Sequence, residues 1–163
     1  MTTSISRAQF LRGNFTGKRQ HIRPPWTGSE PEFTGNCTRC NACVDACPEN
    51  IIQTDDKGFP RINFMKSECT FCGDCASACH DNVIQQGPVA WSLFASITEK
   101  CLPLQGVVCG VCAEECETTA IKMKLVAGGI SLPQLETDAC TGCGACYRVC
   151  PTQAITLSYG ANA

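Results

Sequence analysis

Cysteine spacing constrains this chain more than any other feature of its sequence. In the clearest motif, which runs from Cys140 to Pro151, three cysteines lie three residues apart, a fourth follows four residues later, and a proline comes directly behind it. This spacing is typical of bacterial [4Fe-4S] sites, in which three thiolates bind one cluster and the fourth binds a neighbouring cluster. One such motif therefore predicts a second.

Three further motifs of this kind account for every remaining cysteine. They are followed by Pro48, His80 and Glu117, and the third motif has seven residues, instead of two, between its first two cysteines. All sixteen cysteines belong to the four motifs, which are Cys37, Cys40, Cys43 and Cys47; Cys69, Cys72, Cys75 and Cys79; Cys101, Cys109, Cys112 and Cys116; and Cys140, Cys143, Cys146 and Cys150.

Zinc and disulfide bonds are the alternatives for so many thiols. Structural zinc sites usually combine two C-x2-C pairs, which would leave the third cysteine of each motif unused. Disulfide bonds form in oxidising compartments, and no secretory signal precedes these cysteines. We therefore predict iron-sulfur clusters, with the two alternatives still open at this point.

The exchange of the fourth cysteine between paired motifs predicts four ligand sets. Pairing motif one with two, and three with four, gives four [4Fe-4S] clusters. Because of the long gap that follows Cys101, we expect its site to hold a less stable cluster. The sets are Cys37, Cys40, Cys43 and Cys79 (site 1); Cys47, Cys69, Cys72 and Cys75 (site 2); Cys101, Cys109, Cys112 and Cys150 (site 3); and Cys116, Cys140, Cys143 and Cys146 (site 4).

The composition indicates that these clusters form much of the core. Aromatic residues make up only 7% of the chain, whereas sixteen of its 163 residues are cysteine. A chain of this kind is usually held together through its cysteines rather than by a large apolar interior. We therefore expect the metal-free chain to be largely unfolded.

Charge and motif content limit the function. The formal net charge is -2, and four clusters with their thiolates would lower it to roughly -10. An acidic protein repels nucleic-acid phosphates, so we exclude DNA and RNA and expect redox partner proteins with basic surfaces. The sequence has no phosphate loop, dinucleotide fingerprint or nucleophile-base pair, so we expect no catalytic site besides the clusters.

The repeat predicts an α+β fold of two tandem bacterial-type two-cluster [4Fe-4S] ferredoxin-like modules, with short β-hairpins and short helices. Polar residues and then an apolar pair follow each fourth cysteine (CPENII, CHDNVI, CETTAI and CPTQAI), as expected for a structural repeat. Short strands are predicted at 48–54, 60–64, 120–125, 130–132 and 154–157. We predict a basic arm at 1–30, modules at 31–87 and 101–163, and an apolar linker at 88–100.

The linker contains the most apolar segment outside the motifs. Leu93, Phe94 and Ile97 would share one face of a helix. We interpret this segment as core that joins the two modules, and an exposed helix for partner docking is the alternative.

The N-terminal segment differs from the rest of the chain in charge. Five basic residues precede the first acidic residue, Glu30, and predict an arm that folds back on the acidic modules or docks a partner. One arginine stands where a twin-arginine export signal needs two, and no run approaches the ~20 apolar residues of a membrane helix. We therefore expect a cytoplasmic protein without direct membrane insertion. The basic residues are Arg7, Arg12, Lys18, Arg19 and Arg23.

Several features besides the common cysteine spacing occur together. They are the basic leader with Ser6 and Arg7, the IRPPW segment at 22–26, the first motif as CTRCNAC, the gap from Cys101 to Cys109, and the fourth motif as CTGCGAC. With these features, nearly the whole sequence resembles the NapF-type ferredoxins of the periplasmic nitrate reductase system. It departs from them in the leader, where Ala8 stands in place of a second arginine that is often seen.

The resemblance implies a cytoplasmic iron-sulfur accessory protein that contacts the precursor of the catalytic molybdenum subunit before export. It would assist maturation of that subunit by supplying electrons or by helping its [4Fe-4S] cluster to form. The residues alone lead only to a four-cluster electron carrier. A polyferredoxin that feeds a reductase or a quinol-oxidising complex is therefore the second hypothesis.

Overall fold

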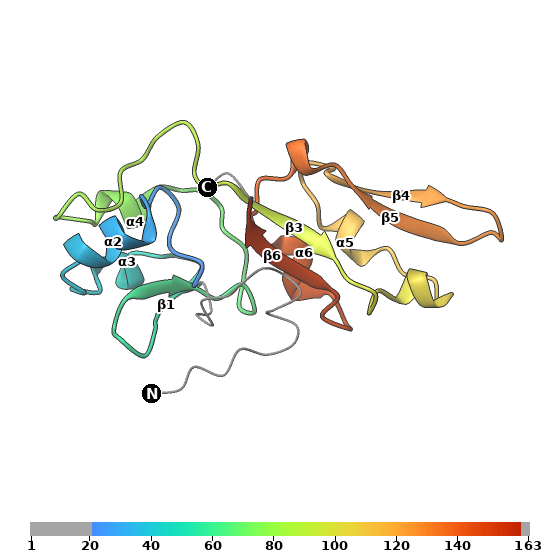
Figure 1. Ribbon diagram of the computed structural model, residues 1–163, viewed down its shortest axis with the longest axis horizontal. Coiled ribbons are helices and arrows are strands. Elements are labelled where there is room, and N and C mark those ends of the chain that lie inside the picture. The colour runs from blue at the N-terminus through green and yellow to red at the C-terminus, as the bar shows by residue number, and fades with distance from the viewer. Residues whose placement is uncertain (1–20, 161–163) are drawn as a thin grey trace.

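The computed structural model describes residues 21–160, which form two halves lying side by side (Figure 1). Antiparallel strand pairs β1-β2, β4-β5 and β3-β6 combine with short helices in an α+β arrangement, as predicted. The first half contains α2 (Glu30–Asn36), α3 (Ala42–Asp45), β1 (Ile52–Thr54), β2 (Pro60–Ile62) and α4 (Asp74–Ser77). The second contains β3 (Leu93–Ile97), η1 (Leu102–Gln105), α5 (Val111–Glu114), β4 (Ile121–Leu125), β5 (Ser131–Leu135), η2 (Thr137–Ala139), α6 (Ala145–Val149) and β6 (Ile155–Tyr159).

The helices in this part of the chain are short. None that lies within residues 21–160 is long and apolar enough to cross a membrane.

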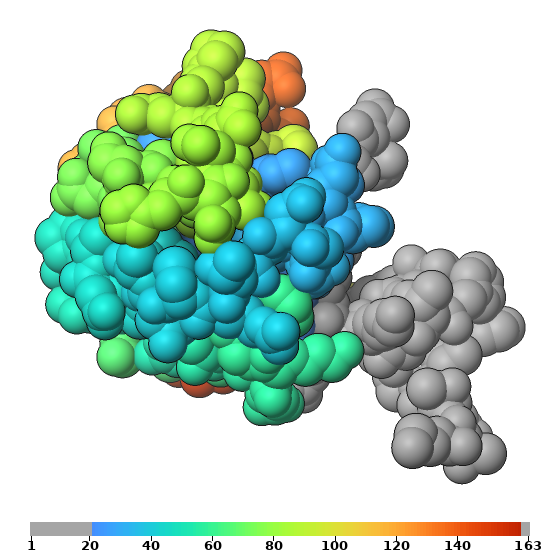
Figure 2. All heavy atoms as spheres, turned by 90° about the vertical axis from the view of Figure 1, so that its left-hand side faces the viewer, coloured from blue at the N-terminus to red at the C-terminus, as the bar shows by residue number. Residues whose placement is uncertain are grey.

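Figure 2 shows the molecule from the end that is formed by the first half, where the segments around α2, α3 and α4 pack together. Of the predicted basic arm, Arg7, Arg12, Lys18 and Arg19 lie outside the described residues.

One turn recurs after the fourth cysteine of every motif. The third residue beyond that cysteine adopts a left-handed backbone, with φ between 51° and 54°, and its N–H donates to the carbonyl of the cysteine at 2.9–3.1 Å. The turn reverses the chain and carries the apolar pair that follows it into the interior. The four residues are Asn50, Asn82, Thr119 and Gln153.

The segment predicted to have a helical face is strand β3 instead. It pairs antiparallel with β6, from Leu93 opposite Tyr159 to Ile97 opposite Ile155. Leu93 and Ala95 are buried, which is the period of two expected for a strand. The helical prediction was wrong because the hydrophobic periodicity of so short a run does not distinguish a helix from a strand. The strand is determined instead by its distant partner, as in the hydrogen bond between the Ser96 and Thr156 hydroxyls, which are 60 positions apart.

The same strand packs against both halves of the molecule. Leu93 belongs to the buried cluster that contains Ile62 and Phe64 of the first half, while Ala95 packs with Ile121 and Ile155 of the second. The segment therefore joins the two halves as core, and it is not an exposed docking helix.

Arg23 is buried rather than part of an exposed basic arm. Its Nε and Nη2 donate to the Glu30 carboxylate at 2.9 and 2.7 Å, and its Nη1 donates to Asp55 at 3.0 Å and to the Pro60 carbonyl at 2.9 Å. The side chains of Arg23 and Asp55 are 6% and 4% exposed. A buried charge needs a partner of opposite sign. The bonds to Glu30 and Asp55 meet this need, and the bond to Asp55 connects the N-terminal segment to the β1-β2 hairpin.

We expect Arg23→Met to lower the free energy of unfolding by about 3–5 kcal/mol, because it leaves the buried Asp55 carboxylate without its cation. Anaerobic denaturant titration of the holoprotein measures this loss. The matched control is Lys122→Ala, which breaks the exposed ion pair with Glu136 and should lower the free energy by about 0–1 kcal/mol. Equal losses for both variants would contradict the prediction.

Candidate metal centres

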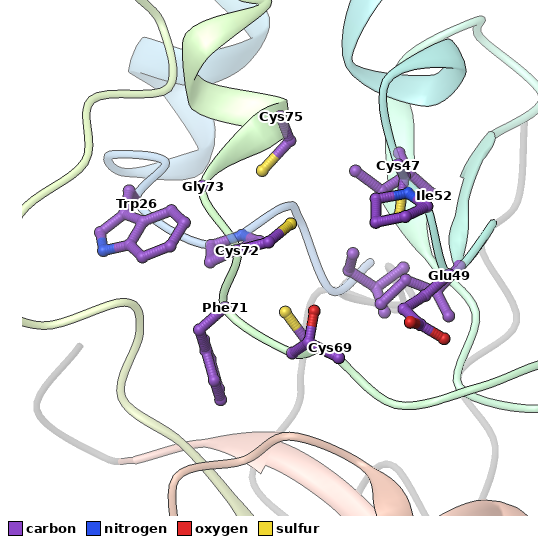
Figure 3. Close-up of a pocket in the computed structure, with 14 residues that line it drawn as sticks. Trp26, Cys47, Glu49, Ile52, Cys69, Phe71, Cys72, Gly73 and Cys75 are labelled. Carbon is purple, nitrogen blue, oxygen red and sulfur yellow. The ribbon is translucent and has the colours of Figure 1, made fainter.

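Each of the four predicted ligand sets lines a cavity of its own. The four cavities are similar in size, and each is lined by the cysteines of one set. In Figure 3, Cys47 from the first motif faces the same space as Cys69, Cys72 and Cys75 from the second. Cys101 also joins its predicted partners in site 3, despite the long gap behind it. The structure thus brings all sixteen predicted site residues together in the expected groups of four.

Four thiols line each of the four cavities. Within residues 21–160, no three His, Cys, Asp or Glu side chains converge closely enough to bind one metal ion. A structural zinc ion would need four ligands at about 2.3 Å from a common point. All sixteen cysteines are described, and all are free thiols. Four thiols around one cavity are the number of ligands that a [4Fe-4S] cluster requires.

Left-handed backbone shapes the loops of three motifs. The second residue after the first cysteine has φ between 55° and 71°, and the residue before the following helix has φ between 65° and 89°. Successive amides in such loops form concavities that bind anions. Glycine, which adopts this backbone without strain, occupies three of these six positions, and the three non-glycine members carried no sequence signal. The residues are Arg39, Phe71 and Gly142, and then Asn41, Gly73 and Gly144.

The third motif departs from this pattern. Gly110, which precedes α5, has φ of -149° instead of a positive value. The longer gap is folded into η1, and Gly106 closes that turn with φ of 83°. Site 3 therefore has a differently shaped loop around its cysteines, and the lower stability expected of its cluster stays a prediction.

We expect Gly144→Ala to reduce the iron content of the protein by up to one cluster, roughly four iron atoms per chain. The φ of Gly144 is 89°, and a Cβ atom there would overlap the ring of Phe64. Iron and acid-labile sulfide analysis of the purified protein measures the effect. Gly106→Ala is the control, because its φ of 83° is similar but nothing lies within 4 Å of its added Cβ. Gly106→Ala should lower the free energy of unfolding by about 1–2 kcal/mol and retain all the iron. Equal iron content in the two variants would count against the prediction.

Burial changes the acidity of the thiols in the metal-free chain. Burial, and after it the charge of neighbouring thiolates, raises the pKa of Cys43, Cys75 and Cys146 to about 12. For Cys150, burial is outweighed by hydrogen bonds, including one from the Ala154 N–H at 3.2 Å, so its pKa is lowered. Most of these buried thiols must therefore lose a proton when they bind a metal.

Contacts between the cavities establish their order in space. Helix α3, which carries Cys43 of site 1, packs against α4, which carries Cys75 of site 2. Helix α6, which carries Cys146 of site 4, packs against α5, which carries Cys112 of site 3. Between the halves, the Cys69 N–H of site 2 donates to the Cys143 carbonyl of site 4 at 2.8 Å. The spatial order of the sites is therefore 1, 2, 4, 3.

Aromatic side chains close the junction between sites 2 and 4. Trp91 donates its indole N–H to the Thr141 carbonyl at 2.8 Å, and its ring packs edge-on against Phe64 and Phe71. Gly142 lies directly against Leu93, which leaves no room for a side chain. The two halves are thus held together beside two ligand loops.

The fold and the four cysteine-lined cavities define a ferredoxin-type protein with two dicluster modules. Family models described as "4Fe-4S dicluster domain" match residues 36–83 and 107–155. The chain is 42% identical to the ferredoxin-type protein NapF of Escherichia coli strain K12, over 98% of each chain. It is 41% identical to NapF of Haemophilus influenzae, over 95% of this chain and 94% of the relative. The chain belongs to the NapF family of ferredoxin-type proteins.

More distant similarity extends to other ferredoxin-type proteins. NapG of Escherichia coli strain K12 is 33% identical over 79% of this chain and 65% of its own length. The similarity to NapF reaches beyond the residues matched by the dicluster models, and it therefore includes segments outside the cysteine motifs.

Proposed function

We propose that this protein is a cytoplasmic iron-sulfur accessory protein that contacts the catalytic-subunit precursor of a periplasmic nitrate reductase and assists its maturation before export. The observation that carries the proposal is the similarity to NapF over almost the whole of both chains. The similarity to NapG, by contrast, covers 79% of this chain and 65% of that relative. The assistance consists of supplying electrons or of helping the subunit's own [4Fe-4S] cluster to assemble.

The sixteen cysteines are proposed to hold four [4Fe-4S] clusters, one in each cavity. When bound, these clusters supply one-electron transfer. The protein's own contribution is to bind them through thiolates, to direct backbone N–H groups toward them, and to limit the access of water. Cys40 and Cys72 are exposed whereas Cys43 and Cys75 are buried, so sites 1 and 2 each have one side near the surface.

A second candidate function is a polyferredoxin that carries electrons to a reductase or quinol-oxidising complex. The hydrogen bond between Cys69 and Cys143 favours it, because this bond holds sites 2 and 4 next to each other across the two halves. A series of adjacent sites is what a long-range electron carrier requires. An accessory protein that only contacts its partner does not need this continuity.

An anaerobic binding assay with the purified nitrate reductase catalytic precursor tests the first candidate. The full chain is compared with a chain that lacks residues 1–20, which removes Arg7, Arg12, Lys18 and Arg19 and leaves the buried Arg23 in place. Binding to the precursor, and weaker binding to the mature subunit, supports the maturation role. Weaker binding after the deletion assigns part of the contact to the basic residues.

The same assay separates the two candidates. Absence of binding to the precursor, together with four clusters that survive repeated reduction and oxidation, would favour the electron carrier. Labile clusters and selective binding to the immature subunit would favour the accessory protein.

A further inference from the structure

An exposed apolar surface lies over site 3. The exposed fractions are 52% for Leu104, 50% for Val107, 89% for Val108 and 36% for Val111. Val111 also lines the cavity that contains Cys101. We call these four side chains the apolar loop surface. Single exposed apolar residues are common, but four within eight positions beside a metal centre indicate a contact surface.

The backbone beneath this surface is held by hydrogen bonds. The N–H of Leu104 donates to the Cys101 carbonyl at 3.1 Å, and the N–H of Val107 donates to the Leu102 carbonyl at 3.0 Å. The chain here has seven residues between its cysteines where the other three motifs have two. The additional residues therefore form an ordered turn that presents apolar side chains outward, at a place where the other motifs have only a tight loop.

Acidic residues border the apolar loop surface. Glu114 is the last residue of α5 and Glu115 is its C-cap. They follow Val111 by three and four positions, which places both near Val111 on one side of this helical turn. Glu117 follows shortly after, and all three glutamates are exposed. In the part of the chain from 21 to 160, none of the three forms an ion pair. An apolar centre with a charged border is the usual composition of a protein-protein interface.

We propose that the apolar loop surface is the docking site for the catalytic-subunit precursor. This inference rests on the proposed function and adds the place and chemistry of the contact. The matching surface of the precursor is an apolar patch bordered by lysine or arginine, because the glutamates beside Val111 would attract such residues. Docking there brings the partner to site 3, which is one end of the spatial series of sites.

Two valine variants test the docking site. Val108→Asp places a charge in the centre of the proposed contact, whereas Val89→Asp makes the same change at a side chain that is 71% exposed and lies in the segment between the halves. The anaerobic affinity of each holoprotein for the purified precursor is measured after its iron content has been matched to the wild type. We expect Val108→Asp to weaken binding at least about tenfold and Val89→Asp to change it by less than about twofold.

The possible outcomes distinguish this inference from the proposed function. If the wild type binds the precursor and Val108→Asp binds as tightly, the docking site is wrong and the proposed function stands. If only Val89→Asp weakens binding to the precursor, the contact lies at residues 88–97 and the inference is also overturned. If the wild type does not bind, both the docking site and the proposed function are wrong. Tighter wild-type binding at low salt is also expected, since the acidic border is exposed to screening.

Discussion

Chelation of iron from the holoprotein is expected to unfold the chain, with the second half losing its structure first. The buried cluster of the first half includes Ile51, Ile52, Ile62 and Phe64, whereas that of the second consists of Ala95, Ile121, Cys146 and Ile155. Smaller apolar side chains bury less area and contribute less to the free energy of folding. The second half therefore depends more strongly on what fills its two cysteine-lined cavities.

Far-ultraviolet circular dichroism and limited proteolysis, both performed without oxygen, measure this result. We expect the native spectrum to be lost when iron is removed and to return when iron and sulfide are added back, because metal binding and folding are coupled. Early cleavage sites should lie between residues 98 and 153. A metal-free chain that keeps its native spectrum, or that is cleaved first in the first half, would contradict this expectation.

Sites 2 and 4 are expected to interact magnetically when both are reduced. A variant with serine at Cys37, Cys40, Cys101 and Cys109 would retain only these two sites. Because the Cys69 N–H and the Cys143 carbonyl share a hydrogen bond of 2.8 Å, the two paramagnetic clusters would lie close together. We expect a broadened, complex electron paramagnetic resonance spectrum instead of the sum of two simple signals.

The comparison variant carries serine at Cys47, Cys72, Cys116 and Cys146 and would retain only sites 1 and 3. Contacts place these sites at opposite ends of the series, so their signals should be simple and additive. Each variant is examined only when analysis finds about eight iron atoms per chain, the content of two clusters. Simple signals from the first variant at this iron content would show that the two halves are not coupled.

The grouping of the thiols could be predicted because it depends on local geometry. Three cysteines in one loop can face the same cavity, while the fourth, which lies further along the chain, faces the cavity of the paired motif. The structure places Cys47 beside the cysteines of the second motif and Cys79 beside those of the first, as predicted. The hairpins were also predictable, since turn residues and short apolar runs mark them. Their ends differ by a few residues, as in β5, which runs through Pro133 to Leu135.

Features that depend on distant partners could not be predicted in this way. The conformation of Leu93–Ile97 is determined by pairing with β6, and nothing in these five residues, four of them apolar, identifies that partner. Arg23 was assigned to a basic arm because charge patterns do not reveal burial against Glu30 and Asp55. The junction at Cys69 and Cys143 depends on how two similar modules pack, about which the motifs carry no information.

The pairing of β3 with β6 also affects how the protein is made on the ribosome. β3 is synthesised before the third and fourth cysteine motifs, and its partner β6 only after them. Ala95 packs against Ile121 and Ile155, which are synthesised later, so the nascent second half must expose Ala95 while its cysteines emerge one by one. Site 3, whose proposed ligands include both Cys101 and Cys150, cannot be completed until nearly the whole of this half has left the exit tunnel. A cluster in site 3 would therefore be completed later in synthesis than one in site 1, which has all four of its proposed ligands by Cys79.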